Sequence, residues 1–284
     1  MLAAAGAGGY APGMIGRAIG HGISTLRDAI ARRLIALGVT PNMLTMAGLA
    51  CTLAAGASLA LGAGAPFGWT LRPGPAAAYA PNAWTLAALV LLLLCAAGDM
   101  LDGAVARLGG KATTFGAFLD STLDRVSDFA IFAGIAFYFA CRGNVTHTLL
   151  PMLAVFAGLM ISYTRARAED LIDFCTVGYW QRGERVAAVL IAAAACNIPA
   201  LLWQQALLPL LTVWARIDFT RRVAAGQTPV TDPRKSTRAI DKLKLWRYPR
   251  MTWQYDLVTG LNILWLIFAR IPDRFDPIGA ALGL

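Results

Sequence analysis

The sequence has few charged residues for its size. Only 14% of its 284 residues are Asp, Glu, Lys or Arg, whereas 57% are hydrophobic. Soluble domains usually contain about 25% charged residues, so this composition excludes an ordinary water-soluble domain. The net charge of +9 does not by itself indicate nucleic-acid binding, because its meaning depends on where the basic residues lie.

Histidine and suitably spaced cysteine are also scarce. The chain has two histidines, His21 and His147, and five scattered cysteines that lie mostly in apolar runs. No cysteine pair has metal-ligand spacing, and the odd number suggests no disulfide framework. The N-terminus lacks a basic start followed by an apolar core, so we expect no cleavable signal peptide.

Long apolar runs are what the sequence has instead. A hydrocarbon core of ~30 Å needs roughly 20 helical residues, and helices are expected because they satisfy their own backbone in lipid. Six segments meet this need, at 43–63, 83–102, 116–140, 147–167, 184–201 and 202–220. The boundary between the last two is weakly marked. We predict an all-α integral membrane protein built as a six-helix transmembrane bundle.

Lys and Arg alternate between the two ends of these predicted spans. They are frequent before the first span, after the second, between the fourth and fifth, and after the sixth. The other connections contain Arg72, Arg142 and none. Because basic loops stay in the cytoplasm, we expect both termini and the segment between the second and third spans to be cytoplasmic.

The flanking segments look interfacial. Residues 13–37 carry isoleucine and leucine at steps of three and four with interspersed basic residues, which is typical of an amphipathic helix on a membrane surface. The tail at 234–255 mixes cations with Trp and Tyr, which suits lipid headgroups; a solvated basic tail is the alternative. The apolar run 260–271 is short for a span, so we expect it to lie along the membrane or to pack on the bundle.

These features divide the chain into three regions. We assign residues 1–42 to an N-terminal tail and interfacial helix, 43–222 to the six-span domain, and 223–284 to a basic and aromatic extension at the membrane surface.

Two aspartates lie at the end of the second predicted span. The residues that share one face of this helix, at positions i, i+3, i+4 and i+7, are Asp99, Asp102, Gly103 and Ala106. Arg107 adjoins the same face. Two carboxylates, two small residues and a guanidinium are therefore expected on one side of the helix.

The third span repeats the pattern with Gly116, Asp120 and Asp124 at i, i+4 and i+8. The connection at 108–115 is short, so we expect the two helices to be antiparallel neighbours and the four carboxylates to converge. An Asp at the centre of a transmembrane helix costs roughly 2.5–3.5 kcal/mol, which makes a functional role the better explanation.

Clustered carboxylates repel one another unless they are protonated or neutralised. Hard divalent cations with oxygen ligands, Mg²⁺ or Mn²⁺, are the natural partners, and two ions about 3.5–4 Å apart can bind a diphosphate. Arg107 can donate two parallel hydrogen bonds to phosphate. The alternative is that the aspartates simply pair with Arg107, Lys111 and Arg125 at the helix ends; the spacing on adjacent spans favours the metal site.

The pattern D-x2-D-G-x2-A-R-x8-G-x3-D-x3-D, from Asp99 to Asp124, resembles the signature of CDP-alcohol phosphotransferases at all eight fixed positions. That family is also a six-span helical bundle, and the resemblance covers about residues 30–220. It implies transfer of a phosphatidyl group from a CDP-linked lipid, such as CDP-diacylglycerol, to an alcohol hydroxyl, with release of CMP.

The resemblance also implies roles for individual residues. Asp99, Asp102 and Asp120 would bind two Mg²⁺ or Mn²⁺ ions, and Asp124 would both bind metal and act as general base. The residues of the CDP site would be Gly103, Ala106, Arg107 and Gly116. Asp128, one turn further along, is expected to be a structural partner.

Arginines after the fourth span and before the fifth suggest the acceptor. Arg165, Arg182 and Arg185 either decorate the cytoplasmic surface by reaching to headgroups or form a pocket for a phosphorylated acceptor. The segments SYTRARAE (162–169) and RGER (182–185) resemble those of phosphatidylinositol phosphate and archaetidylinositol phosphate synthases in this family. We slightly favour inositol 1-phosphate over glycerol 3-phosphate, with an uncharged or zwitterionic alcohol third.

Two other classes of protein use aspartates in membrane helices. A membrane prenyltransferase also binds a diphosphate through Mg²⁺, but its two motifs would lie far apart in sequence. An ion-coupled transporter would not need Gly, Ala and Arg at these spacings. We expect a CDP-lipid, a small alcohol and membrane lipids as partners, no nucleic acid, and leave a homodimer open.

Overall fold

The computed structural model describes residues 14–63, 83–227, 244–245, 248, 250, 252–269, 271–272 and 274–283, with no side-chain description before residue 24. The helices are α1 (Met14–Ala36), α2 (Pro41–Gly62), α3 (Ala83–Leu108), α4 (Thr114–Ala140), α5 (Val145–Glu169), α6 (Arg182–Ala194), α7 (Ile198–Leu207), α8 (Pro209–Ala224), α10 (Trp253–Phe268) and α11 (Pro277–Leu282). This part of the chain contains no strand, so the predicted all-α class is confirmed.

Four stretches of the described residues are long and apolar enough to cross a membrane. They are Pro41–Gly62, Ala83–Leu108, Val145–Glu169 and the nearly continuous α7–α8, Ile198–Ala224. The protein is therefore an integral membrane protein. Helix α4 has a similar length, 27 residues, but its charged residues lower its hydropathy. A bundle with six crossings stays a prediction.

The predicted boundary between the fifth and sixth spans, at residues 201 and 202, is wrong. Helix α6 ends at Ala194, the backbone of Cys196 has a positive φ of 49°, and α7 begins at Ile198. Pro199 lies in the first turn of α7, where a missing N–H costs nothing, whereas inside a helix it would remove a hydrogen bond. The break therefore precedes the proline, and α6 is only 13 residues long.

Helix α2 organises one side of the bundle. It packs closely against both α3 and α4, whereas α3 and α4 make few contacts with each other, so the prediction that α3 and α4 are direct neighbours is wrong. Where α2 crosses α4, Gly56 and Gly134 bring the two backbones into contact, and a Cβ on either glycine would overlap the other helix. Small residues permit such close approach of membrane helices.

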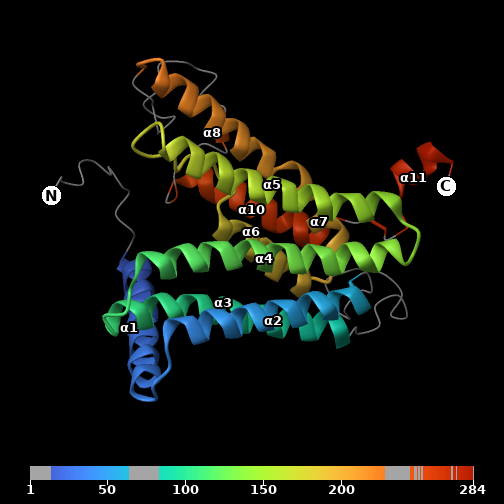
Figure 1. The fold of residues 1–284 in the computed structure, drawn as a ribbon. Helices are drawn as coiled ribbons and strands as arrows, with labels where there is room; N and C mark the ends of the chain where they lie inside the picture. The colour runs from blue at the N-terminus through green and yellow to red at the C-terminus, as the bar shows by residue number, and fades with distance from the viewer. Residues whose placement is uncertain are drawn as a thin grey trace.

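The bundle has two distinct ends (Figure 1). We call the end with the α3–α4 connection, residues 109–113, the motif end, and the end with the α4–α5 turn, residues 141–144, the far end. Helix α1 lies across the motif end, and α11 lies beyond the far end (Figure 1).

Helix α1 occupies the range predicted for an N-terminal amphipathic helix. Its Ala31 is buried with Ala104 and Val105 of α3, while Leu26 and Ile30, on the predicted apolar face, are 64% and 39% exposed. An exposed apolar face is what a membrane-surface helix requires. The interfacial position itself remains a prediction.

Helix α10 packs along α6 and α7. Packing on the bundle is one of the two alternatives predicted for the apolar run 260–271, and it is confirmed. Most of the predicted basic tail at 234–255, the N-terminal residues 1–13 and the loop at 64–82 lie outside the described residues.

Candidate active site

The four motif aspartates lie on α3 and α4, within a few turns of the motif end. Asp102 and Asp124 are buried, with 8% and 9% of their surfaces exposed, and Asp99 and Asp120 are partly buried. The hydroxyl of Thr45 on α2 donates a hydrogen bond of 3.0 Å to Asp102 Oδ2. Helix α2 therefore contributes to the site as well as to the packing between α3 and α4.

Arg182, the first residue of α6, connects the two acidic helices. Its Nη2 lies 3.0 Å from Asp99 Oδ2 and 2.6 Å from Asp124 Oδ1. One guanidinium can reach both carboxylates only if they face a common point, so Asp99 and Asp124 converge although α3 and α4 hardly touch. Asp124 also has Arg125 at 3.5 Å, and this is the one ion pair among the described residues that matches the predicted helix-end alternative.

The donor set fits a hard divalent cation in its chemistry. Carboxylate oxygens are the ligands that Mg²⁺ and Mn²⁺ prefer. Asp99 and Asp124 share the guanidinium of Arg182, and Asp124 also pairs with Arg125. In the described ranges, no three His, Cys, Asp or Glu side chains lie close enough together to hold a metal as they stand. A divalent ion at Asp99 and Asp124 would compete with Arg182 for these carboxylates.

The residues predicted for the CDP site lie at the same end. A Cβ on Gly103 would lie 3.4 Å from Nη1 of Arg107, so the arginine folds back over the space that the glycine leaves. The amide of Gly116 donates to Thr113 Oγ1 at 2.9 Å, which caps the start of α4. Ala106 lies on α3 one turn after Gly103.

Two of the three predicted acceptor arginines reach the acidic residues. Besides Arg182, Arg185 is buried and its Nη2 lies 2.9 Å from Asp128 Oδ2, in line with the structural role expected for Asp128. Arg165 instead pairs with Glu169 at 2.9 Å and lines the cavity beside the start of α6.

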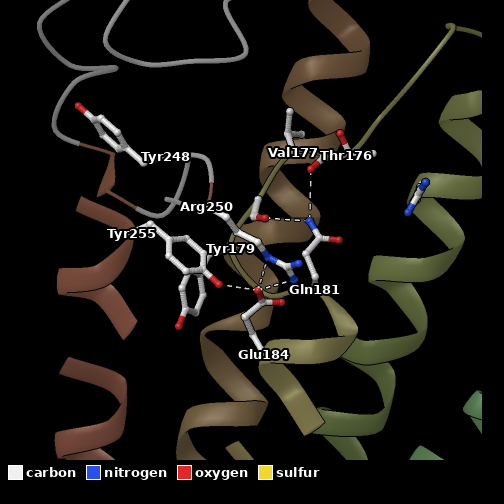
Figure 2. A pocket seen from close by; sticks show the side chains of 10 residues that line it. Thr176, Val177, Tyr179, Gln181, Glu184, Tyr248, Arg250 and Tyr255 are labelled. Atoms are coloured by element: carbon white, nitrogen blue, oxygen red, sulfur yellow. Dashed lines mark hydrogen bonds and ion pairs between the residues drawn. The ribbon is translucent and has the colours of Figure 1, made fainter. Parts of the chain in front are cut away.

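A cavity of about 510 Å³ lies beside the start of α6. It is lined by Arg165, by the α5–α6 connection, by Glu184, and by Tyr248, Arg250 and Tyr255 from the C-terminal extension (Figure 2). The position of the C-terminal extension beside the start of α6 was not predicted from the sequence.

Arg216 on α8 is a residue that the sequence analysis missed. It is 1% exposed, and it donates to Val177 O at 3.3 Å, to Gln181 Oε1 at 3.0 Å and to the carbonyl of Ile161. It thereby ties α5, α8 and the connection leading to α6. The available signal was an arginine within a predicted span, which is costly in lipid and is kept where it binds buried acceptors.

Comparison with known proteins gives a family match and a consistent set of relatives. The CDP-alcohol phosphatidyltransferase family matches residues 38–219. The archaetidylinositol phosphate synthase of Pyrococcus horikoshii is 34% identical over 201 residues, which is 70% of this chain and 93% of that protein. The phosphatidylinositol phosphate synthase of Mycobacterium tuberculosis is 34% identical over 223 residues, covering 76% of this chain and 89% of the relative.

A shorter match has higher identity. The archaetidylinositol phosphate synthase of Methanothermobacter thermautotrophicus is 50% identical over 105 residues, 36% of this chain, and the chain spans about half of that relative's length, 51%.

Solved structures agree with the sequence matches. The Mycobacterium tuberculosis phosphatidylinositol phosphate synthase with CDP-DAG bound has a TM-score of 0.58 at 27% identity, and the match covers 72% of this chain and all of that one, 100%. The same enzyme with manganese and citrate has a TM-score of 0.56, with coverage of 75% and 97%.

Proposed function

Because the chain belongs to the CDP-alcohol phosphatidyltransferase family, a family of membrane transferases, we propose that it transfers the phosphatidyl group of CDP-diacylglycerol to inositol 1-phosphate and releases CMP. The resemblance read from the Asp99–Asp124 pattern is thereby confirmed at the level of the family. The relatives are a phosphatidylinositol phosphate synthase and an archaetidylinositol phosphate synthase, which supports the proposed acceptor.

The observation that carries the proposal is the position of Arg182 between Asp99 and Asp124. Arg182 thereby places a cation, which could bind an anionic acceptor, next to the carboxylates that are expected to hold the metal for the CDP-lipid. Arg185, three residues along α6, adds a second buried cation beside Asp128. An acceptor that carries a phosphate would find donors there, since arginine binds phosphate through parallel hydrogen bonds.

We propose that two divalent metal ions, Mg²⁺ or Mn²⁺, bind to the motif aspartates Asp99, Asp102, Asp120 and Asp124. When bound, such ions would neutralise the diphosphate and stabilise the leaving oxygen of CMP. A relative whose structure contains manganese supports divalent metal in this family.

The residues of the chain divide the remaining work. Gly103, Ala106, Arg107 and Gly116 would bind the CDP group. The acceptor hydroxyl oxygen forms a bond to the phosphorus that carries the diacylglycerol, the bond from that phosphorus to CMP breaks, and Asp124 accepts the hydroxyl proton. A positioned carboxylate can act as such a base.

The motif end and α1 are proposed to face the cytoplasm. Basic residues gather at this end, in α1, in the α3–α4 connection and around the start of α6, as the positive-inside rule requires. A homodimer remains a prediction.

The test is release of CMP from CDP-diacylglycerol by the detergent-solubilised protein, with inositol 1-phosphate, glycerol 3-phosphate and serine as separate acceptors. We expect the highest kcat/KM with inositol 1-phosphate. A higher kcat/KM with glycerol 3-phosphate would assign the protein to phosphatidylglycerophosphate synthesis instead, and the highest value with serine would contradict a phosphorylated acceptor.

A further inference from the structure

The first turn of α6 presents charged side chains in two directions. Arg182 and Arg185 contact the aspartates of α3 and α4, whereas Glu184 lines the cavity and contacts the C-terminal extension (Figure 2). This turn is therefore the point where the extension meets the active site.

Glu184 is held by two side chains of the extension. Its Oε1 lies 2.6 Å from Nη2 and 2.9 Å from Nε of Arg250, and it accepts a hydrogen bond of 2.5 Å from the hydroxyl of Tyr255. The Glu184 side chain is only 8% exposed. The Tyr255 ring packs 5.1 Å from the ring of Tyr179, which precedes α6. Glu184 is thus shielded from solvent, whereas its partner Arg250 is 62% exposed.

The start of α6 is held by contacts with other segments rather than by a side-chain cap. The preceding connection, 170–181, is not α-helical, and within the described residues Gln181 makes no side-chain hydrogen bond to cap the helix. A helix start without a side-chain cap depends on contacts of this kind. Arg250 and Tyr255, by holding Glu184, add a further contact, and both residues lie beyond the family match at 38–219.

We propose that Glu184 is a positioning residue through which the C-terminal extension fixes Arg182 and Arg185 for binding of the acceptor. The proposal rests on the proposed function, in which these arginines bind the acceptor's phosphate. Disruption of the contact should weaken acceptor binding while the CDP-lipid site, built on α3 and α4, is unaffected.

The test compares Glu184→Gln and Tyr255→Phe with a matched control, Asp256→Asn, which removes an exposed acid from the same turn of α10. We expect the acceptor KM to rise about five- to tenfold in Glu184→Gln and about two- to threefold in Tyr255→Phe, as for coupled contacts in one network. The KM for CDP-diacylglycerol and the kinetics of Asp256→Asn should stay within about twofold of the wild type.

Arg182→Gln separates the two hypotheses. If Arg182→Gln raises the acceptor KM and Glu184→Gln does not, the positioning role is wrong and the proposed function stands. If neither variant changes the acceptor KM, the proposed acceptor site is wrong as well. Equal rises in both KM values for Tyr255→Phe, which removes one hydroxyl and keeps the ring, would also overturn the positioning role.

A second inference rests on the opposite end of the extension. Asp276 accepts hydrogen bonds from the backbone amides of Val145 and Thr146, both at 2.8 Å, and from the Thr146 hydroxyl at 2.5 Å. The amide of Asn144 donates to the carbonyl of Phe275 at 3.2 Å. These partners form the start of α5, which is at the far end.

Helix α10 connects this contact with the one at the motif end. Its first turn holds Tyr255 against Glu184, and near its last turn the Asn197 amide, between α6 and α7, donates to the carbonyl of Leu266 at 2.8 Å. At 1.5 Å per residue, 16 residues span roughly 24 Å. The chain therefore passes from one end of the bundle to the other.

The outward face of α10 carries large apolar side chains from its first turn to its last, beside one exposed acid in the first turn, Asp256. The large side chains on this face, between 44% and 69% exposed, are Trp253, Leu257, Leu261, Leu264 and Phe268. Apolar residues that stay exposed from end to end of a helix are suited to lipid rather than to water.

We infer that α10 is an additional membrane crossing and that the C-terminus lies on the opposite side of the membrane from the motif end. The expectation of a shared cytoplasmic location for both termini then fails for the C-terminus. Arg250, just before α10, then stays on the side of the motif end, in agreement with the positive-inside rule.

The test uses single-cysteine variants in cells, in a background where the other cysteines are replaced. Ala281→Cys reports the C-terminus, the native Cys141 reports the far end, and Lys111→Cys reports the motif end; all three positions are exposed. We expect an impermeant maleimide to label Ala281→Cys and Cys141 from one side and Lys111→Cys only from the other. Labelling after unfolding in detergent confirms that each thiol is reactive.

Labelling of Ala281→Cys from the same side as Lys111→Cys would overturn the crossing, whichever side of the membrane that is. A thiol at residue 281 that resists the reagent from both sides but reacts after unfolding would place the C-terminus within the membrane and would also overturn it.

Discussion

Aspartates at the two ends of the bundle have opposite surroundings. At the far end, the carboxylate of Asp276 accepts from a hydroxyl and from backbone amides that point at it. At the motif end, Asp99 and Asp124 share the guanidinium of Arg182. The donors around Asp276 are neutral and belong mainly to the backbone. The partner of Asp99 and Asp124 is a charged side chain from another helix.

This difference teaches how to tell a structural carboxylate from a functional one. Asp276 caps α11 and contacts the start of α5, so its removal affects how the chain is held together. Asp99 and Asp124 are balanced by the side chain of Arg182; under the proposed function, loss of the motif carboxylates should affect chemistry. Four predictions sharpen or break this comparison.

Chelation should have the largest effect. We expect no turnover in excess chelator and full recovery with Mg²⁺ or Mn²⁺, because the diphosphate otherwise has only arginine to neutralise it. CMP release measured before and after metal addition is the readout. Full turnover in chelator would show that the motif carboxylates are structural like Asp276.

Substitutions within the motif should separate the base from the metal ligands. Asp124→Asn should lower kcat by about 10²–10⁴-fold, the usual contribution of a general base, with a smaller effect on CDP-lipid binding. Asp99→Asn and Asp102→Asn should weaken both, because a lost metal serves ground state and transition state alike. Equal binding loss in all three variants, measured by CDP-lipid titration, would remove the distinct role of Asp124.

Substitution of the α6 arginines should raise the KM for the acceptor and leave the KM for the CDP-lipid unchanged. Arg182→Gln or Arg185→Gln should raise the acceptor KM about ten- to a hundredfold, the loss of a charge-assisted phosphate contact of roughly 1.5–3 kcal/mol. Arg107→Gln is the contrast, since it should raise the CDP-lipid KM first. Arg165→Gln tests the third predicted acceptor residue, for which pairing with Glu169 indicates a smaller rise.

An unchanged acceptor KM in the α6 variants, with activity retained, would favour a neutral alcohol as acceptor. Reduced expression with both KM values unchanged would instead indicate that these arginines act only on membrane topology.

Asp276→Asn should have the smallest effect on catalysis and should appear as a loss of stability. The Thr146 hydroxyl and the backbone amides of Gly279, Thr146 and Val145 hold the pKa of Asp276 well below its usual range. A depressed folded pKa gives stability that is present above the unfolded pKa of about 3.9 and is lost as the pH falls towards the folded pKa.

Thermal unfolding in detergent provides the measurement. The midpoint of Asp276→Asn should lie below that of the wild type at pH 7, and the difference should shrink as the pH falls below about 4. Both KM values should stay within about twofold of the wild type. A change in either KM larger than that would break the separation between the two ends.

The motif end was predictable because its information is local. Helical spacing places Asp99 and Asp102 on one face and Asp120 and Asp124 on another. The apolar runs set the bounds of α2, α3 and α5 to within a few residues, apart from the last turns of α3, which continue to Leu108. Convergence of Asp99 with Asp124 was also expected, although the reason given, direct packing of α3 on α4, was wrong because α2 packs on both.

The rest depends on contacts between distant segments. The sequence around Glu184 does not indicate its partner Arg250, which lies 66 residues away. The same holds for Asp276, whose partners Val145 and Thr146 lie about 130 residues away. The break before α7 did have a local signal, Pro199 two residues after Asn197, but the surrounding apolar residues concealed it. Arg165 was grouped with Arg182 because both flank one connection, and sequence distance is a poor guide to which way a side chain points.

The contact between Gly56 and Gly134 restricts how α4 can tilt, and a tilt there would move the aspartates of α4. Ten residues separate Gly134 from Asp124, which is roughly 15 Å along a helix. A tilt of about five degrees at the glycines would move the carboxylate by roughly 1 Å, more than the ~0.5 Å tolerance of a catalytic geometry. Because the backbones of α2 and α4 are in direct contact at these glycines, α4 has little freedom to tilt. The position of the Asp124 carboxylate thus depends on two residues that have no side chain.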